Sequence, residues 1–106
     1  MSWLILFVAG LFETSWAIGM KYSNGFTKLY PSIFTIITMA ISVYLLSVSL
    51  KTIPVGTAYA VWTGIGAVGT AILGIILFGE SKELMRIIFI FLIIVGIVGL
   101  RVFSVE

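Results

Sequence analysis

Long apolar runs dominate the chain, and only a few short polar segments interrupt them. A helix that crosses about 30 Å of hydrocarbon needs about 20 apolar residues. The sequence therefore predicts four membrane-spanning helices, at residues 3–20, 31–50, 55–78 and 84–103. The breaks between them are a turn-forming "SNG" at residues 23–25, the connection around Lys51, and a polar "GESKE" at residues 79–83.

Composition agrees with this pattern. The chain is 61% hydrophobic and 9% charged, whereas soluble domains carry about 25% charged residues. So few charges cannot cover a water-exposed surface. We therefore expect an all-α integral membrane protein in which residues 1–106 form a single four-helix transmembrane domain. Residues 1–10, "MSWLILFVAG", lack a basic segment and a cleavage site, so they are interpreted as part of the first span rather than a signal peptide.

The charged and reactive residues exclude several function classes. The net charge is +2 and the basic residues are scattered, so no nucleic acid partner is expected. The chain has no cysteine and no histidine, which excludes disulfides and the commonest zinc sites. No nucleophile with a matching base is visible, so we expect neither an enzyme nor a bound metal or cofactor.

Basic residues also bear on membrane orientation. The first and third connections together carry four basic residues, which are Lys21, Lys28, Lys82 and Arg86. The second connection and the C-terminus, on the other side of the membrane, carry two, which are Lys51 and Arg101. The positive-inside rule would place the first and third connections in the cytoplasm. A bias this small is equally typical of a chain that inserts in both orientations, so both topologies stay open.

One ionisable side chain, Glu13, lies deep within a predicted span. An unpaired charge at that depth costs about 3 kcal/mol or more. Lys21, the nearest basic residue along this helix, is about 12 Å away along its axis. Glu13 must therefore be protonated, hydrogen-bonded, facing water or paired with an external cation. An intramembrane acid is a functional candidate by default; the structural alternative is a protonated side chain that holds two helices together.

The neighbours of Glu13 favour a binding role. Gly10, Thr14 and Ala17 share its helix face and are small, so a ligand could approach the carboxylate, and Trp16 adds an aromatic wall at a similar depth. The second span carries four hydroxyl residues on one side, which are Thr35, Thr38, Ser42 and Ser49. They either line a polar interior or bond locally to backbone carbonyls. Ser42, near the middle of its span, is the predicted partner of Glu13.

The third span adds two aromatic side chains and several glycines. Tyr59 and Trp62 are three residues apart and share a helix face. Three glycines in the middle of this span, Gly64, Gly66 and Gly69, lower its helix stability. They either allow close packing against a neighbouring helix or allow a bend in a moving helix. In the fourth span, Gly96 and Gly99 form a shallow groove that suits packing against a second chain.

Together these residues predict a site for an organic cation. Aromatic faces attract cations, and a carboxylate adds charge and strong hydrogen bonds. A carboxylate that holds either a proton or a cation exchanges one for the other, which is the minimal logic of an antiporter. Alternating access is commonly built from two inverted repeats, and this chain contains one such unit. An antiparallel homodimer would supply the second repeat and bring two Glu13 carboxylates together.

Four features resemble a known family. They are Glu13, "KYSNGFTKLYPS" at residues 21–32, "IPVGTAYAVWTGIGAVGT" at residues 53–70, and "FGES" at residues 78–81. With them the chain resembles the small multidrug resistance transporters over nearly its full length. Trp16 and the "AYAVWTGIGAVGT" run resemble the guanidinium-exporter subtype of that family. Thr14 and Ser15 stand where the subtype more often has apolar residues, and Arg101 stands where Lys is common.

The resemblance implies an antiparallel, dual-topology homodimer in the bacterial inner membrane that exports guanidinium in exchange for protons. It implies that Glu13 is the shared proton and substrate site, and that the residues lining this site are Gly10, Trp16, Ser42, Tyr59 and Trp62. Two alternatives stay open. In the first, the same architecture exports bulky quaternary ammonium or lipophilic cationic drugs. In the second, the chain is a non-transporting subunit that regulates a larger membrane partner.

Overall fold

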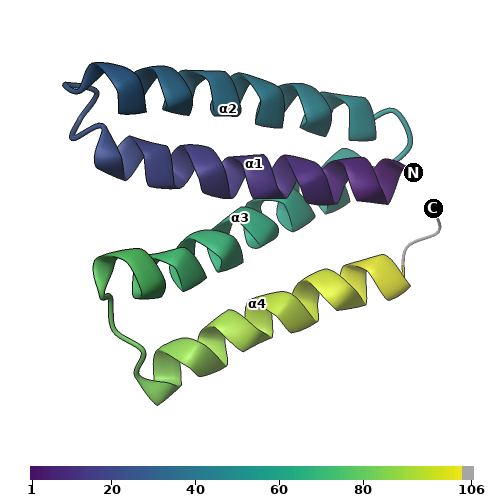
Figure 1. Ribbon diagram of the computed structural model, residues 1–106. Coiled ribbons are helices and arrows are strands. Elements are labelled where there is room, and N and C mark those ends of the chain that lie inside the picture. The colour runs from purple at the N-terminus through teal and green to yellow at the C-terminus, as the bar shows by residue number, and fades with distance from the viewer. Residues whose placement is uncertain (104–106) are drawn as a thin grey trace.

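Four helices make up the fold, which is seen in a computed structural model that describes residues 1–103. They are α1 (Ser2–Tyr22), α2 (Leu29–Ser49), α3 (Val55–Phe78) and α4 (Leu84–Val102) (Figure 1). The helices contain 19 to 24 residues, so each is about 28 to 36 Å long and can cross the hydrocarbon of a bilayer. The predicted all-α fold with four transmembrane helices is confirmed. The last three residues of the predicted 1–106 domain lie outside the described residues.

The helix ends lie close to the predicted span limits. Helix α3 has the same bounds as its predicted span, and α4 ends one residue earlier, with Phe103 as its C-cap. Helix α1 is longer than its span at both ends. Helix α2 begins at Leu29 rather than Pro31, so the proline sits within the first turn, where its missing N–H costs no helical hydrogen bond.

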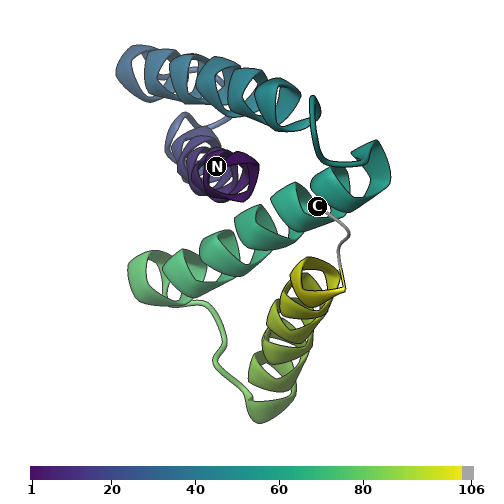
Figure 2. The same ribbon diagram turned by 90° about the vertical axis from the view of Figure 1, so that its right-hand side faces the viewer.

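Helix α1 is the centre of the packing. Its backbone packs closely against both α2 and α3, whereas the α4 backbone packs closely against α3 alone among the described helices. A side-chain contact from Arg101 of α4 to the Trp3 ring also links α4 to the start of α1. Figure 2 shows α4 on the far side of α3 from α1 and α2. The start of α1 and the end of α4 lie at the same end of the molecule (Figure 1). Helix α1 is therefore covered on two sides, while α4 is covered on one.

The buried core is small and made largely of small or medium side chains. Leu6 and Ala9 of α1 meet Ala58, Val61 and Trp62 of α3 there. Most large apolar side chains point outward, and α4 has no buried residue at all. This distribution is expected in a bilayer, because lipid tails are as apolar as leucine and give large side chains no reason to turn inward.

The four hydroxyl residues predicted to share one face of α2 all point inward. Thr35, Thr38, Ser42 and Ser49 are buried. Three of them, Thr35, Thr38 and Ser49, donate to carbonyls of their own helix at 2.7 to 2.8 Å. Only Ser42 reaches another helix. Both readings of this face therefore hold: it points to the interior, and most of its hydroxyls are satisfied locally.

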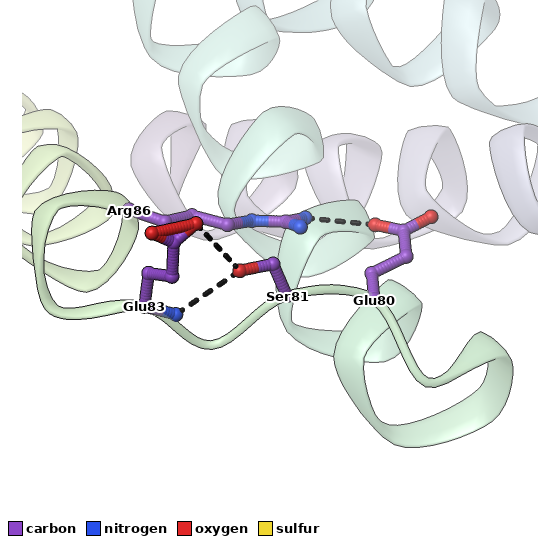
Figure 3. A network of polar contacts seen from close by, with 4 residues as sticks. All are labelled: Glu80, Ser81, Glu83 and Arg86. Atoms are coloured by element: carbon purple, nitrogen blue, oxygen red, sulfur yellow. Dashed lines mark hydrogen bonds and ion pairs between the residues drawn. The ribbon is translucent and has the colours of Figure 1, made fainter.

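A polar network lies in the connection between α3 and α4 and at the start of α4 (Figure 3). Gly79 adopts a left-handed conformation at φ 64° and ends α3, a conformation that glycine takes without a steric penalty. Arg86 of α4 donates to the Glu80 carboxylate at 2.7 Å, and Ser81 donates to Glu83 at 3.3 Å. Arg86 and Glu80 are 31% and 45% exposed, so the ion pair adds little stability and mainly orients the connection.

Candidate functional site

Glu13 points from α1 toward α3, where its carboxylate lies against the backbone of Gly66. A Cβ atom added at Gly66 would overlap the Glu13 side chain. Gly66 is itself buried. The missing side chain at this position therefore forms a seat for the carboxylate, which no other amino acid would leave open.

Near Gly66, two buried polar atoms of α1 lack a hydrogen-bond partner. Glu13 Oε1 and Trp16 Nε1 are buried, and neither has a hydrogen-bond partner within residues 1–103. A buried polar atom without a partner costs about 1 to 3 kcal/mol. The single chain thus holds one free acceptor on a carboxylate and one free donor on an indole, three residues apart on the same helix.

A short hydrogen-bond chain ties the three inner helices together. The Trp62 Nε1–H of α3 donates to Ser42 Oγ of α2 at 3.0 Å. Ser42 Oγ donates in turn to the Ala9 carbonyl of α1 at 2.7 Å. Both bonds are buried, so they fix the Trp62 ring and the α2 backbone relative to the helix that carries the carboxylate.

The aromatic residues of α3 share the face that seats Glu13. Tyr59, Trp62 and Gly66 follow a three- and four-residue spacing, which places them on one side of the helix. The Tyr59 and Trp62 rings are tilted by 52° with centroids 5.6 Å apart. Trp62 is 9% exposed, while Tyr59 is 57% exposed. Tyr59 is therefore the more accessible of the two rings.

Two of the predicted site residues make contacts other than those expected. Ser42, the predicted partner of Glu13, hydrogen-bonds to Ala9 and Trp62 instead. Its hydroxyl has one proton, and the Ala9 carbonyl takes it. Gly10 faces the Ile65 side chain of α3, which a Cβ atom would strike. Within the single chain, the small size of Gly10 serves helix packing, and its role in lining a substrate site stays a prediction.

The three glycines predicted to bend or pack α3 lie at close contacts. Gly66 receives Glu13, Gly69 receives Thr14, and Gly64 lies beside the α4 side chains. Helix α3 is assigned as one helix from Val55 to Phe78, and a bend at these glycines stays a prediction. The seat for Glu13 was not foreseen from the sequence. Its signal was the spacing of Gly66, which lies about one helical turn beyond Trp62 and two turns beyond Tyr59 on the same face of the helix.

The α4 glycines are open. A Cβ atom at Gly96 or Gly99 would meet nothing within 4 Å. Their predicted role in packing against a second chain is therefore untested by the single chain, and it stays a prediction.

Removing the Ser42 hydroxyl should destabilise the inner helices. In Ser42→Ala, the buried Trp62 N–H loses its acceptor, which we expect to cost about 1 to 3 kcal/mol. Thermal unfolding in detergent measures the loss. Ser47→Ala is the matched control, because the exposed Ser47 hydroxyl bonds only to Tyr44 of its own helix. Equal stability of the two variants would contradict a structural role for the Trp62–Ser42–Ala9 chain.

The charged groups of the described residues leave Glu13 without a counter-ion. Among residues 1–103 the recorded ion pair is Arg86 with Glu80, at one end of the bundle. No group of three or more His, Cys, Asp or Glu side chains in this part of the chain could hold a metal ion. Within residues 1–103, the Glu13 carboxylate therefore has neither a basic partner nor a metal-binding cluster beside it.

Comparison with known proteins identifies a family and close relatives. The model of the Small Multidrug Resistance protein family matches residues 1–93. A guanidinium exporter from Yersinia pseudotuberculosis is 62% identical over 104 residues, which cover 98% of this chain and 100% of that protein. Guanidinium exporters from Proteus vulgaris and Citrobacter freundii are 59% and 58% identical, over 98% and 95% of this chain and 100% and 96% of their own lengths.

Proposed function

The chain belongs to the small multidrug resistance family of membrane transporters, and on that premise we propose that it exports guanidinium and related guanidinyl cations in exchange for protons. It is a multi-pass protein of the bacterial inner membrane and a transporter rather than an enzyme. Its relatives named guanidinium exporters support a small organic cation as the substrate.

The observation that carries the proposal is the unpartnered Glu13 carboxylate. Its Oε1 atom is buried without a hydrogen bond in a helix bundle that offers it no cation. Guanidinium is planar and presents paired N–H groups that match a carboxylate. The exposed Tyr59 ring and the Trp62 ring beside it supply aromatic faces for such a cation. In this proposal Glu13 binds the substrate, and Trp16, Tyr59 and Trp62 surround it.

Coupling follows from the use of one carboxylate for two ligands. A proton on Glu13 removes the charge that binds guanidinium, and a bound guanidinium excludes the proton. When the site opens to the proton-rich side, a proton displaces the cation. When it opens to the cytoplasm, the cation displaces the proton. The bond from Ser42 to Ala9 holds α1 against α2 during this exchange, so Glu13 moves with the inner helices as a unit.

An antiparallel homodimer is part of the proposal. Among the described helices, the α4 backbone packs closely against α3 alone and α4 has no buried residue, so it has a free side for a second chain. The open surfaces at Gly96 and Gly99 lie on that helix. Two chains in opposite orientation form the inverted pair that alternating access commonly uses. Their two Glu13 groups then titrate as a coupled pair.

Substrate selectivity distinguishes the proposal from drug export. Purified protein in liposomes should exchange labelled guanidinium rapidly, and an excess of a bulky aromatic quaternary ammonium ion should compete poorly. Stronger competition by the aromatic ion would favour the drug-export alternative. Absence of any exchange by the purified chain would favour a regulatory subunit.

Guanidinium binding should weaken as the pH falls. The cation needs the charged form of Glu13, so acid conditions that protonate Glu13 remove its binding site. For one competing proton, affinity falls by up to about tenfold per pH unit. Titration calorimetry of the detergent-solubilised protein across pH 6 to 9 measures this dependence. An affinity that stays constant over this range would contradict competition at a single carboxylate.

A further inference from the structure

A groove runs between α1, α3 and α4 on the side of α1 that faces away from α2. Its volume is about 300 Å³, and apolar side chains such as Phe7, Ile65 and Val98 line it. Trp3 and Arg101 lie at one end. A second groove of about 270 Å³ shares Phe7, Ile65 and Val98 with the first and continues deeper into the membrane region. Together they form one continuous apolar groove, with the positively charged Arg101 side chain at one end.

Arg101 is held at that end by an aromatic ring. Its guanidinium carbon lies 5.0 Å from the centre of the Trp3 ring, which brings the end of α4 to the start of α1. Within residues 1–103, the recorded ion pair involves Arg86 and Glu80, and Arg101 has no carboxylate partner. A guanidinium that stacks on a ring keeps its N–H edge available for hydrogen bonds.

We propose that an anionic phospholipid binds this groove, with its phosphate on Arg101 and an acyl chain along the apolar surface between α3 and α4. Arginine donates paired N–H groups to phosphate oxygens. Arg101 lies one residue before the end of a membrane-spanning helix, which is the level of lipid headgroups. The positive charge complements the negative headgroup, and the apolar lining complements the chain.

The shape of the groove favours a lipid over a small soluble anion. From Arg101 to Ile94, which lines the deeper groove, α4 advances by seven residues, or about 10 Å. A soluble anion would use only the arginine and leave this length of apolar surface empty. A phospholipid uses both parts at once. Glu13 does not line this groove, so lipid binding here does not depend on which substrate the protein transports.

Lipid selectivity in vesicles tests the site. Spin-labelled phosphatidylglycerol and phosphatidylcholine are compared for their share of motionally restricted lipid at the protein. One cation near the membrane surface favours an anionic lipid by about 1 kcal/mol, or about fivefold. Arg101→Gln should remove most of this preference. Lys51→Gln is the matched control, because Lys51 lies in the connection at the same end of the bundle, outside the groove. It should leave the preference intact.

Two results would overturn the proposal. If Lys51→Gln lowers the preference as much as Arg101→Gln, the effect is a general surface potential and not a site. If a second chain fills the groove, a benzophenone attached to Val98→Cys will cross-link one copy of the chain to another on irradiation. The native chain has no cysteine, so that cross-link reports on this position alone. A labelled Val98→Cys protein that stays monomeric on denaturing gels, together with selective loss in Arg101→Gln, supports the lipid.

Discussion

Replacing Glu13 with glutamine should abolish guanidinium binding and transport. The change removes the charge and keeps the size, so the carboxamide still fits the seat at Gly66. Loss of one partner from a buried charge pair costs about 2 to 5 kcal/mol, which corresponds to at least about 30-fold weaker binding. Titration calorimetry measures the affinity, and uptake of labelled guanidinium into liposomes measures transport.

The control for this change is Glu83→Gln. It makes the same chemical substitution at an exposed carboxylate in the connection between α3 and α4. We expect normal binding and uptake from this variant. Retention of guanidinium affinity in Glu13→Gln would exclude Glu13 as the substrate site, whatever the thermal stability of the variant.

The second large effect is expected at Gly66. An alanine there places a Cβ atom within the volume of the Glu13 side chain and forces the carboxylate off its seat. Overpacking of this kind costs about 1 to 3 kcal/mol, so we expect guanidinium uptake to fall by about fivefold or more. Alanine also favours a helix over glycine by about 1 kcal/mol. Thermal stability should therefore fall less than transport does.

Gly56→Ala is the matched control in the same helix. Nothing lies within 4 Å of the Cβ atom that it adds, so this variant gains helix propensity without a clash. It should keep full transport and equal or higher stability. If Gly66→Ala transports as well as Gly56→Ala, the contact between Glu13 and Gly66 does not position the carboxylate.

Much of the fold follows directly from hydropathy. A bilayer allows few structures other than helices of about 20 apolar residues, and this is why the approximate predicted spans lie close to the four observed helices. Helix ends were less certain where polar residues extend a helix into the headgroup region, as Lys21 and Tyr22 do in α1. Hydropathy says nothing of that extension.

The site was harder to predict because it depends on how the helices rotate against one another. Spacing alone indicated that Glu13, Ser42 and Trp62 face the interior, yet it could not say which of them meet. The structure pairs Ser42 with Trp62 and Ala9, and leaves Glu13 over Gly66. The glycines of α3 were interpreted as a bend or as packing positions, and only the packing in three dimensions reveals the seat.

Proton movement driven by a guanidinium gradient tests the central claim most directly. Wild-type protein is reconstituted into liposomes that contain a pH-sensitive dye, and guanidinium is added outside under a clamped membrane potential. Inward flow of the cation through an antiporter should drive protons outward and raise the internal pH, and Glu13→Gln liposomes should show no change. Guanidinium uptake by the wild-type protein without proton movement would contradict exchange at a shared carboxylate.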